Sequence, residues 1–230
     1  MYTIFSCIPL KRKHCRRPLR WTEQSAAFES QISRLTGDSA IASAFVSYAG
    51  PFNKEFRSTL LTRDFYADCV KRGVPVTEDL QVTKFLATES EVGEWSLQGL
   101  PNDDLSVQNG ILVTRATRWP LLIDPQGQGL AWIKAREEAN QLRTTGFLER
   151  QFRNHLEDCL SYGKPMLCAN IEEDVDPVLD PVLEKRFVRS GKGWKIALAD
   201  KEVDYAETFS LFFTTRTTLP QPSTLSCSAS

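Results

Sequence analysis

The residues best placed to do chemistry lie in one segment, residues 119–132, which reads WPLLIDPQGQGLAW. An apolar strand runs into a glycine-containing turn and then into a helix, which is the layout of a phosphate-binding loop. A working loop reads G-x-x-x-x-G-K-[ST]; its backbone N–H groups face the phosphates, its Lys reaches the outer phosphates, and its Ser or Thr holds magnesium. The segment therefore predicts the scaffold of a nucleotide-binding domain.

The positions that carry the chemistry of this loop hold unsuitable residues. Asp124 stands at the first glycine and Gly129 at the second, whereas Leu130 replaces the lysine and Ala131 replaces the Ser or Thr. Leucine cannot neutralise a phosphate, alanine has no oxygen for magnesium, and the carboxylate of Asp124 would repel an incoming anion. The loop still contains two glycines, Gly127 and Gly129. We predict a degenerate, non-functional cofactor site.

A second candidate site fails in the same way. In a nucleotide hydrolase the strand after the helix that follows the loop ends in Asp-Glu, where Asp orders magnesium and Glu polarises water. The matching strand here, residues 165–168, is followed by Ala169 and Asn170. Alanine binds no metal and asparagine cannot act as a base. We therefore predict no catalytic residue, no metal site and no cofactor bound by this module.

Two further clusters invite a functional interpretation but favour a structural one. The acidic residues 172–174 lack the sharp-turn glycine of a calcium loop, and Asp176 before Pro177 fits a helix N-cap. His155 and Cys159 lie on adjacent helix turns, as a thiol nucleophile and its base would. Without an oxyanion donor or a third partner, a histidine on a helix face is the better interpretation.

Composition excludes several classes of protein. The chain has 230 residues, a net charge of −1 and 41% hydrophobic residues, which are ordinary values for a soluble globular protein. Neither nucleic acid nor membrane is indicated as a partner, because there is no charge excess and no apolar run of about 20 residues. The six cysteines show no C-x-x-C pair, and only two histidines exist. We expect reduced core thiols and a cytosolic protein.

The first part of the chain predicts helices. Residues 1–19 form a basic tail that we expect to be disordered, with Pro9 and Pro18 discouraging helix. A helix over residues 21–35 would begin at Thr22, end at Gly37 and carry an apolar spacing that also fits a coiled coil. Further helices are expected over residues 39–49 and 53–73.

Beyond residue 74 the pattern becomes α/β. We expect a helix capped by Asp104 or Ser106, a helix over residues 128–141, one with an apolar stripe from Leu148 that ends at Gly163, and one over residues 177–186. Strands are expected over residues 120–123, 165–168 and 209–215, with a hairpin over residues 194–205. Apolar strands separated by helices predict a mostly parallel sheet flanked by helices, and residues 218–230 read as a disordered tail.

Several of these segments, in this order, resemble motor-region motifs of dynein heavy chains, and axonemal dyneins most closely. They read SYAGPFNKEFR at residues 47–57, QGLPNDDLSVQNG at 98–110, LLIDPQGQG at 121–129, HLEDC at 155–159, DPVLDPVLEK at 176–185 and DKEVD at 200–204. The resemblance covers roughly residues 20–215. This sequence differs from the family at Leu130, where the family often has a basic residue, and at Ala169, where it often has an acidic one. It also differs from the family after Thr215.

The resemblance implies a fold and a role. Residues 20–38 would be the end of the stalk coiled coil, 39–74 the helical end of the fourth AAA+ module, and 75–217 the large P-loop-type subdomain of the fifth. The parent family is a microtubule-motor ATPase of the ciliary or flagellar axoneme, with ATP and magnesium at other modules. The implied partners are neighbouring AAA+ modules, dynein intermediate and light chains, and microtubules. This module would be a non-hydrolysing structural relay.

Two alternatives belong to other classes. A stand-alone interaction module could bind dynein or microtubule-associated partners without motor activity. An active nucleotide-binding enzyme is disfavoured by Leu130 and Ala169 together.

Overall fold

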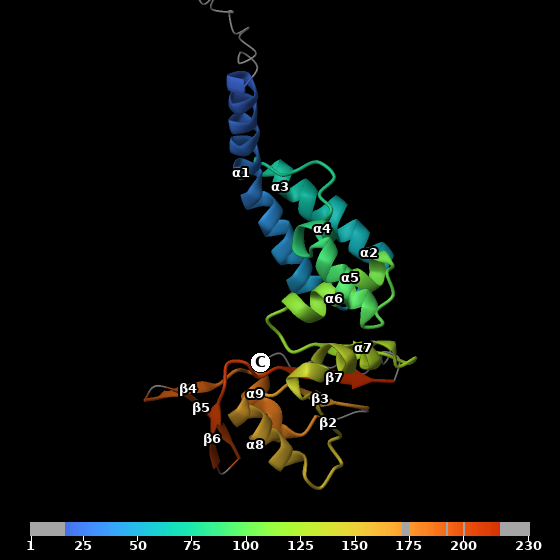
Figure 1. Ribbon diagram of the computed structural model, residues 1–230, viewed down its shortest axis with the longest axis vertical. Coiled ribbons are helices and arrows are strands. Elements are labelled where there is room, and N and C mark those ends of the chain that lie inside the picture. Colours follow the sequence, from blue (N-terminus) through green and yellow to red (C-terminus); the bar gives the residue numbers. More distant parts are fainter. Residues whose placement is uncertain (1–16, 172–174, 192, 200, 217–230) are drawn as a thin grey trace, which may run out of the picture. The chain divides into compact units, whose positions relative to one another are not determined.

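The computed structural model describes residues 17–171, 175–191, 193–199 and 201–216, with the backbone alone for residues 17–27 and 30. The chain divides into two compact units, Met1–Val82 and Thr83–Ser230 (Figure 1). The expected disordered tail over residues 218–230, the first 16 residues of the tail expected over residues 1–19, and the acidic residues 172–174 lie outside the described residues, whereas residues 17–19 are helical.

The first unit is built on one long helix, α1 (Arg17–Tyr48). The predicted start at Thr22 and the predicted stop at Gly37 are both wrong, because the helix runs without a break from Arg17 through Gly37 to Tyr48. Pro18 lies in the first turn, where a helix tolerates the missing N–H. A Cβ at position 37 would lie 2.4 Å from the Pro75 carbonyl oxygen, so the glycine permits a close approach of another segment rather than ending the helix.

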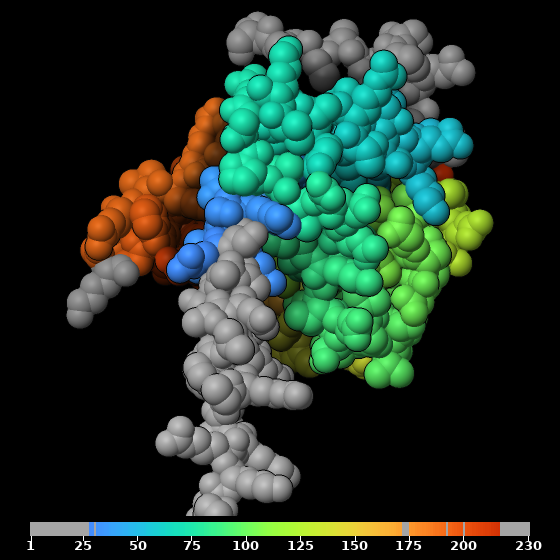
Figure 2. Space-filling model, turned by 90° about the horizontal axis from the view of Figure 1, so that it is seen from above, coloured from blue at the N-terminus to red at the C-terminus, as the bar shows by residue number. Residues whose placement is uncertain are grey.

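A second helical stretch packs along α1 in this unit. It consists of α2 (Lys54–Thr59), a π-helix (Leu60–Tyr66) and α3 (Ala67–Lys71), and it begins at the N-cap Asn53 as the sequence predicts. These helices form the cyan surface of Figure 2. The buried guanidinium of Arg57 donates to the carbonyl oxygens of Ala49 (2.9 Å) and Gly50 (3.1 Å), and so caps the end of α1.

Three short helices follow. They are α4 (Val82–Leu86), α5 (Glu89–Leu97) and α6 (Asp104–Arg115). Thr88 and Glu91 form a reciprocal capping box at the start of α5. The cap of α6 is Asp103 rather than the predicted Asp104 or Ser106, and its carboxylate accepts from the Ser106 N–H at 3.1 Å.

The second unit is organised around a four-stranded parallel sheet. Its strands are β1 (Leu121–Ile123), β2 (Arg143–Thr145), β3 (Met166–Cys168) and β7 (Leu211–Thr215), in the order β1-β7-β3-β2. The helices α7 (Gln128–Glu137), continued by a 3₁₀ turn (Glu138–Asn140), and α8 (Phe152–Tyr162) flank it (Figure 1). The predicted mostly parallel sheet flanked by helices is confirmed.

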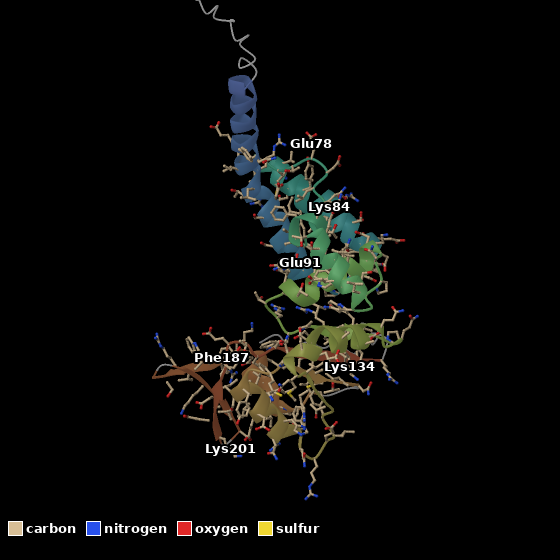
Figure 3. The ribbon with its side chains drawn as sticks, in the orientation of Figure 1. Glu78, Lys84, Glu91, Lys134, Phe187 and Lys201 are labelled. Atoms are coloured by element: carbon tan, nitrogen blue, oxygen red, sulfur yellow. The ribbon has the colours of Figure 1, made fainter. Side chains whose placement is uncertain are left out.

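A smaller antiparallel sheet lies between β3 and β7 in the sequence. It contains β4 (Phe187–Ser190), β5 (Gly193–Leu198) and β6 (Lys201–Tyr205), of which the β5–β6 hairpin was predicted and β4 was not. Lys201, labelled in Figure 3, extends from β6, and its ammonium lies 3.4 Å from the Glu157 carboxylate of α8. One core of buried side chains from α8, β3, β7 and this hairpin joins the two sheets.

Two predicted helices differ from the structure. Leu148 precedes α8 and its side chain is fully exposed, so it is no part of the apolar stripe; Gly163, with φ +66°, ends the helix as predicted. The helix expected over residues 177–186 is limited to a 3₁₀ turn (Pro177–Leu179) and α9 (Asp180–Leu183). The cap at Asp176 is confirmed, because its carboxylate accepts from the Val178 N–H at 3.0 Å.

Candidate functional site: a degenerate phosphate loop

The loop between β1 and α7 joins the end of a parallel strand to the start of a helix, which is the layout of a phosphate-binding loop. Its first residue, Asp124, donates its N–H to the Thr215 carbonyl of β7 at 2.8 Å, which ties the loop to the sheet. Gly127 is the N-cap of α7 with φ +77°, a conformation that favours glycine. At Gly129 a Cβ would lie 2.8 Å from a methyl group of Leu122, so the helix start approaches β1 closely.

The N–H groups of the loop are turned toward Asp124 itself. Its carboxylate accepts from the N–H of Gln128 at 3.0 Å and from that of Leu130 at 2.8 Å. Its carbonyl accepts from the N–H of Gly127 at 3.3 Å. The sequence predicted that Asp124 would repel an anion. The structure adds that the Asp124 carboxylate already accepts the hydrogen bonds that the Gln128 and Leu130 N–H groups could otherwise donate to an anion.

The side chains at the two chemistry-bearing positions of the loop are both apolar. Leu130 is half-buried and Ala131 is exposed at the first turn of α7, the helix marked by Lys134 in Figure 3. Neither carries a charge or a metal ligand.

The end of β3 lies at the same edge of the sheet, since β7 separates β3 from β1 and all three strands are parallel. Ala169 donates its N–H to the Thr145 carbonyl at 2.9 Å, continuing the ladder by one residue. Asn170 is exposed and has φ +57°, a left-handed turn conformation that asparagine tolerates. The two predicted degenerate segments therefore flank one edge, as a nucleotide site would require.

Sequence reasoning missed one polar arrangement at the neighbouring strand end. The Glu149 carboxylate accepts from the Thr145 hydroxyl and from the Gly146 N–H, both at 3.0 Å. These contacts fix the loop after β2. The only sequence signal for them is a Thr and a Glu four residues apart around a glycine. Within the described residues, no group of three or more His, Cys, Asp or Glu side chains could hold a metal ion.

The His155–Cys159 pair does not form a nucleophilic dyad. Cys159 is buried, and burial raises the pKa of its thiol, which disfavours the reactive thiolate. The His155 Nε2 atom lies 2.6 Å from the Arg143 guanidinium of β2, so this contact joins α8 to the edge of the sheet. A pocket of about 320 Å³ opens beside these residues.

Comparison with known protein families identifies the fold. A family model described as the ATP-binding dynein motor region matches residues 93–229, more than half of the chain. The chain belongs to the dynein motor-region family. A second dynein model, described as the microtubule-binding stalk of the dynein motor, matches residues 13–68, which contain the whole of α1. The predicted dynein resemblance is thereby confirmed, and the long helix is consistent with a stalk coiled coil.

Curated dynein relatives cover nearly the same part of this chain. It is 68% identical over 203 residues to the dynein gamma chain of the flagellar outer arm of Chlamydomonas reinhardtii, which is 88% of this chain and 4% of that protein. It is 50% identical over 204 residues to human dynein axonemal heavy chain 8, which is 89% of this chain and 4% of the relative. It is 38% identical over 203 residues to the dynein-1-beta heavy chain of the flagellar inner arm I1 complex of the same alga, 88% of this chain and 4% of the relative.

The chain thus spans about 4% of the length of these dynein relatives. Their names place them in axonemes and flagella. Among the described residues, no helix is long and apolar enough to cross a membrane.

Proposed function

We propose that residues 75–217 serve, within a dynein heavy chain, as the fifth AAA+ module of the motor ring, and that this module neither binds nor hydrolyses nucleotide. In this role it is a structural relay that moves as a block when nucleotide turns over elsewhere in the ring. ATP and magnesium act at other modules. Its partners are the neighbouring modules, and through the complete motor the dynein intermediate and light chains and the microtubule of an axoneme.

One observation supports the proposal. The loop after β1 and the end of β3 lie at the same edge of the sheet, as the two halves of a nucleotide site would. At this edge Leu130 replaces the ammonium of a lysine, Ala131 replaces a magnesium ligand, and Ala169 replaces a carboxylate. A scaffold kept without its chemistry is suited to transmitting movement, since the core that joins both sheets is continuous. Packed cores of this kind move as rigid bodies.

The test uses a complete dynein heavy chain that carries this segment. Ala131→Glu places a carboxylate where a phosphate and its magnesium would lie, and a first-turn acid is compatible with the helix. The matched control is Ala135→Glu, an exposed alanine one turn further along α7. We expect both variants to retain the microtubule-gliding velocity and ATPase rate of the unmodified motor.

A loss of gliding in Ala131→Glu alone would show that this loop must bind nucleotide. A second measurement is titration calorimetry of the 230-residue chain with MgATP, for which we expect no binding. Binding that Ala131→Glu abolishes would contradict the proposal.

A further inference from the structure

We propose that the Asp124 carboxylate is a built-in ligand of its own loop: it occupies the anion position from within and keeps the loop closed to phosphate. This inference rests on the proposed function and deepens it. The missing lysine explains why phosphate would bind weakly, whereas the carboxylate would exclude it even if the lysine were restored.

The geometry is that of a bound anion. The two carboxylate oxygens accept from two different backbone donors, Oδ1 from Gln128 and Oδ2 from Leu130, at 3.0 and 2.8 Å. Backbone N–H groups at this position are the ones that cradle phosphates in a functional loop. A carboxylate at a helix N-terminus is also stabilised by the helix dipole.

The surrounding backbone holds the carboxylate in place. Asp124 is anchored through its N–H to Thr215 and through its carbonyl to Gly127. A Cβ at Gly129 would lie 3.4 Å from Asp124 Oδ2 and closer still to Leu122, so the glycine gives room for the side chain to fold back. The carboxylate is therefore a contact built into β1, the loop and α7 together.

An incoming phosphate would have to displace a tethered competitor. The carboxylate is covalently attached to the loop and needs no association from solution, which gives it a large effective concentration. Once displaced, it would remain beside the phosphate as a like charge. Restoring only the lysine should accordingly leave the loop unable to bind an anion.

The experiment is a double-mutant cycle on the full chain, with inorganic pyrophosphate as the probe and titration calorimetry as the readout. The variants are Leu130→Lys, Asp124→Gly and the double variant. We expect the unmodified chain and Leu130→Lys to bind more weakly than about 1 mM. We expect the double variant to bind at least about tenfold more tightly than Leu130→Lys.

The matched control is Asp103→Asn, which removes the carboxylate cap of α6, a helix that follows α5 rather than a strand of the parallel sheet. It should gain no pyrophosphate binding. The inference is overturned if Leu130→Lys alone binds as tightly as the double variant, or if the folded double variant does not bind.

A second measurement covers the case in which Asp124→Gly does not fold. In Asp124→Asn, an amide replaces the carboxylate at nearly the same size, and the Gln128 and Leu130 amides should exchange with deuterium faster than in the unmodified chain. Unchanged exchange would overturn the inference. MgATP binding by the unmodified chain would contradict the proposed function and the inference together, whereas a failed double-mutant cycle in a chain that binds no MgATP overturns the inference alone, so the two failures are distinguishable.

Discussion

The continuous course of α1 through Gly37 predicts that the same substitution has opposite effects at two helical glycines. An alanine is normally preferred to glycine inside a helix by up to about 1 kcal/mol. At Gly37, however, a Cβ would lie 2.4 Å from both the Pro75 carbonyl oxygen and a methyl group of Val76. At Gly93 of α5, a Cβ would meet nothing within 4 Å.

The expected magnitudes follow from these distances. Overpacking costs about 1–3 kcal/mol, and the upper part of that range applies to Gly37 because one of the two atoms belongs to the backbone and cannot rotate away. After the propensity gain is subtracted, Gly37→Ala should lower the free energy of unfolding of the first unit by about 1–2 kcal/mol. Gly93→Ala should raise that of the second unit by about 0.5–1 kcal/mol.

The assay is urea unfolding of each variant of the full chain, followed by circular dichroism at a helical wavelength and by hydrogen exchange of amides in each unit. Hydrogen exchange assigns each change to the unit that carries it. A Gly37→Ala chain as stable as the unmodified one would refute the close approach of residues 75 and 76 to the helix. A lower free energy of unfolding in Gly93→Ala would refute the finding that a Cβ at position 93 meets no neighbouring atom.

Three more outcomes are expected. Asp38→Ala should destabilise the first unit by about 2 kcal/mol, because the buried carboxylate accepts from the N–H and hydroxyl of Thr77 at 2.8 and 2.7 Å; urea unfolding measures it, and a neutral effect would contradict it. Burial raises the pKa of Cys168 to about 12, so iodoacetamide at pH 8 should modify this thiol only in the urea-unfolded chain. Mass spectrometry of the labelled peptides measures the modification. Labelling of the folded chain at the same rate as the unfolded chain would contradict the prediction. Hydrogen bonds from Thr88 lower the pKa of Glu91 below its ordinary value of 4.5, so the contribution of Glu91 to stability is present above pH 4.5 and is lost as the pH falls through the lowered pKa. The melting temperature of Glu91→Gln should therefore differ from that of the unmodified chain at pH 7 and converge with it in acid. A difference that stays constant with pH would exclude the ionised Glu91 carboxylate as its cause.

Patterns of apolar spacing predicted the architecture well where strands are buried. The strands β3 and β7 are buried along almost their whole length, and both were expected from their apolar runs. The strand β2 was not expected, because its residues Arg143–Thr145 are polar and only the pairing with β3 makes them a strand. Edge strands of this kind carry little periodic signal.

Glycine and leucine signals failed for a different reason. A glycine that ends a helix and one that admits a neighbouring segment are identical in sequence, so the close approach of Pro75 to Gly37 could not be seen. Leu148 has the right spacing from Phe152 and Leu156 for one helical face, but the chain turns before the helix begins. Both failures arise from contacts or turns that local spacing does not encode.

The candidate site was predictable in its residue types but not in its geometry. The replacement of the lysine by Leu130 is read directly from the sequence. That the Asp124 side chain folds back onto the Gln128 and Leu130 N–H groups depends on the path of the loop, which is set by the Thr215 and Gly127 contacts. Sequence supplies the charge, and only the structure shows what the charge contacts.

The strand order β1-β7-β3-β2 has a consequence for synthesis on the ribosome. Among the described strands, the first strand of the parallel sheet, β1, pairs only with the last, so none of these strands can pair with β1 until β7 has left the exit tunnel. During that interval β2 and β3 can already pair, whereas Leu121 and Ile123 remain in an unpaired apolar segment. Pairing at such long sequence separation is slow and leaves the nascent chain open to aggregation. Chaperone engagement during translation should accordingly be concentrated between the emergence of β1 and that of β7.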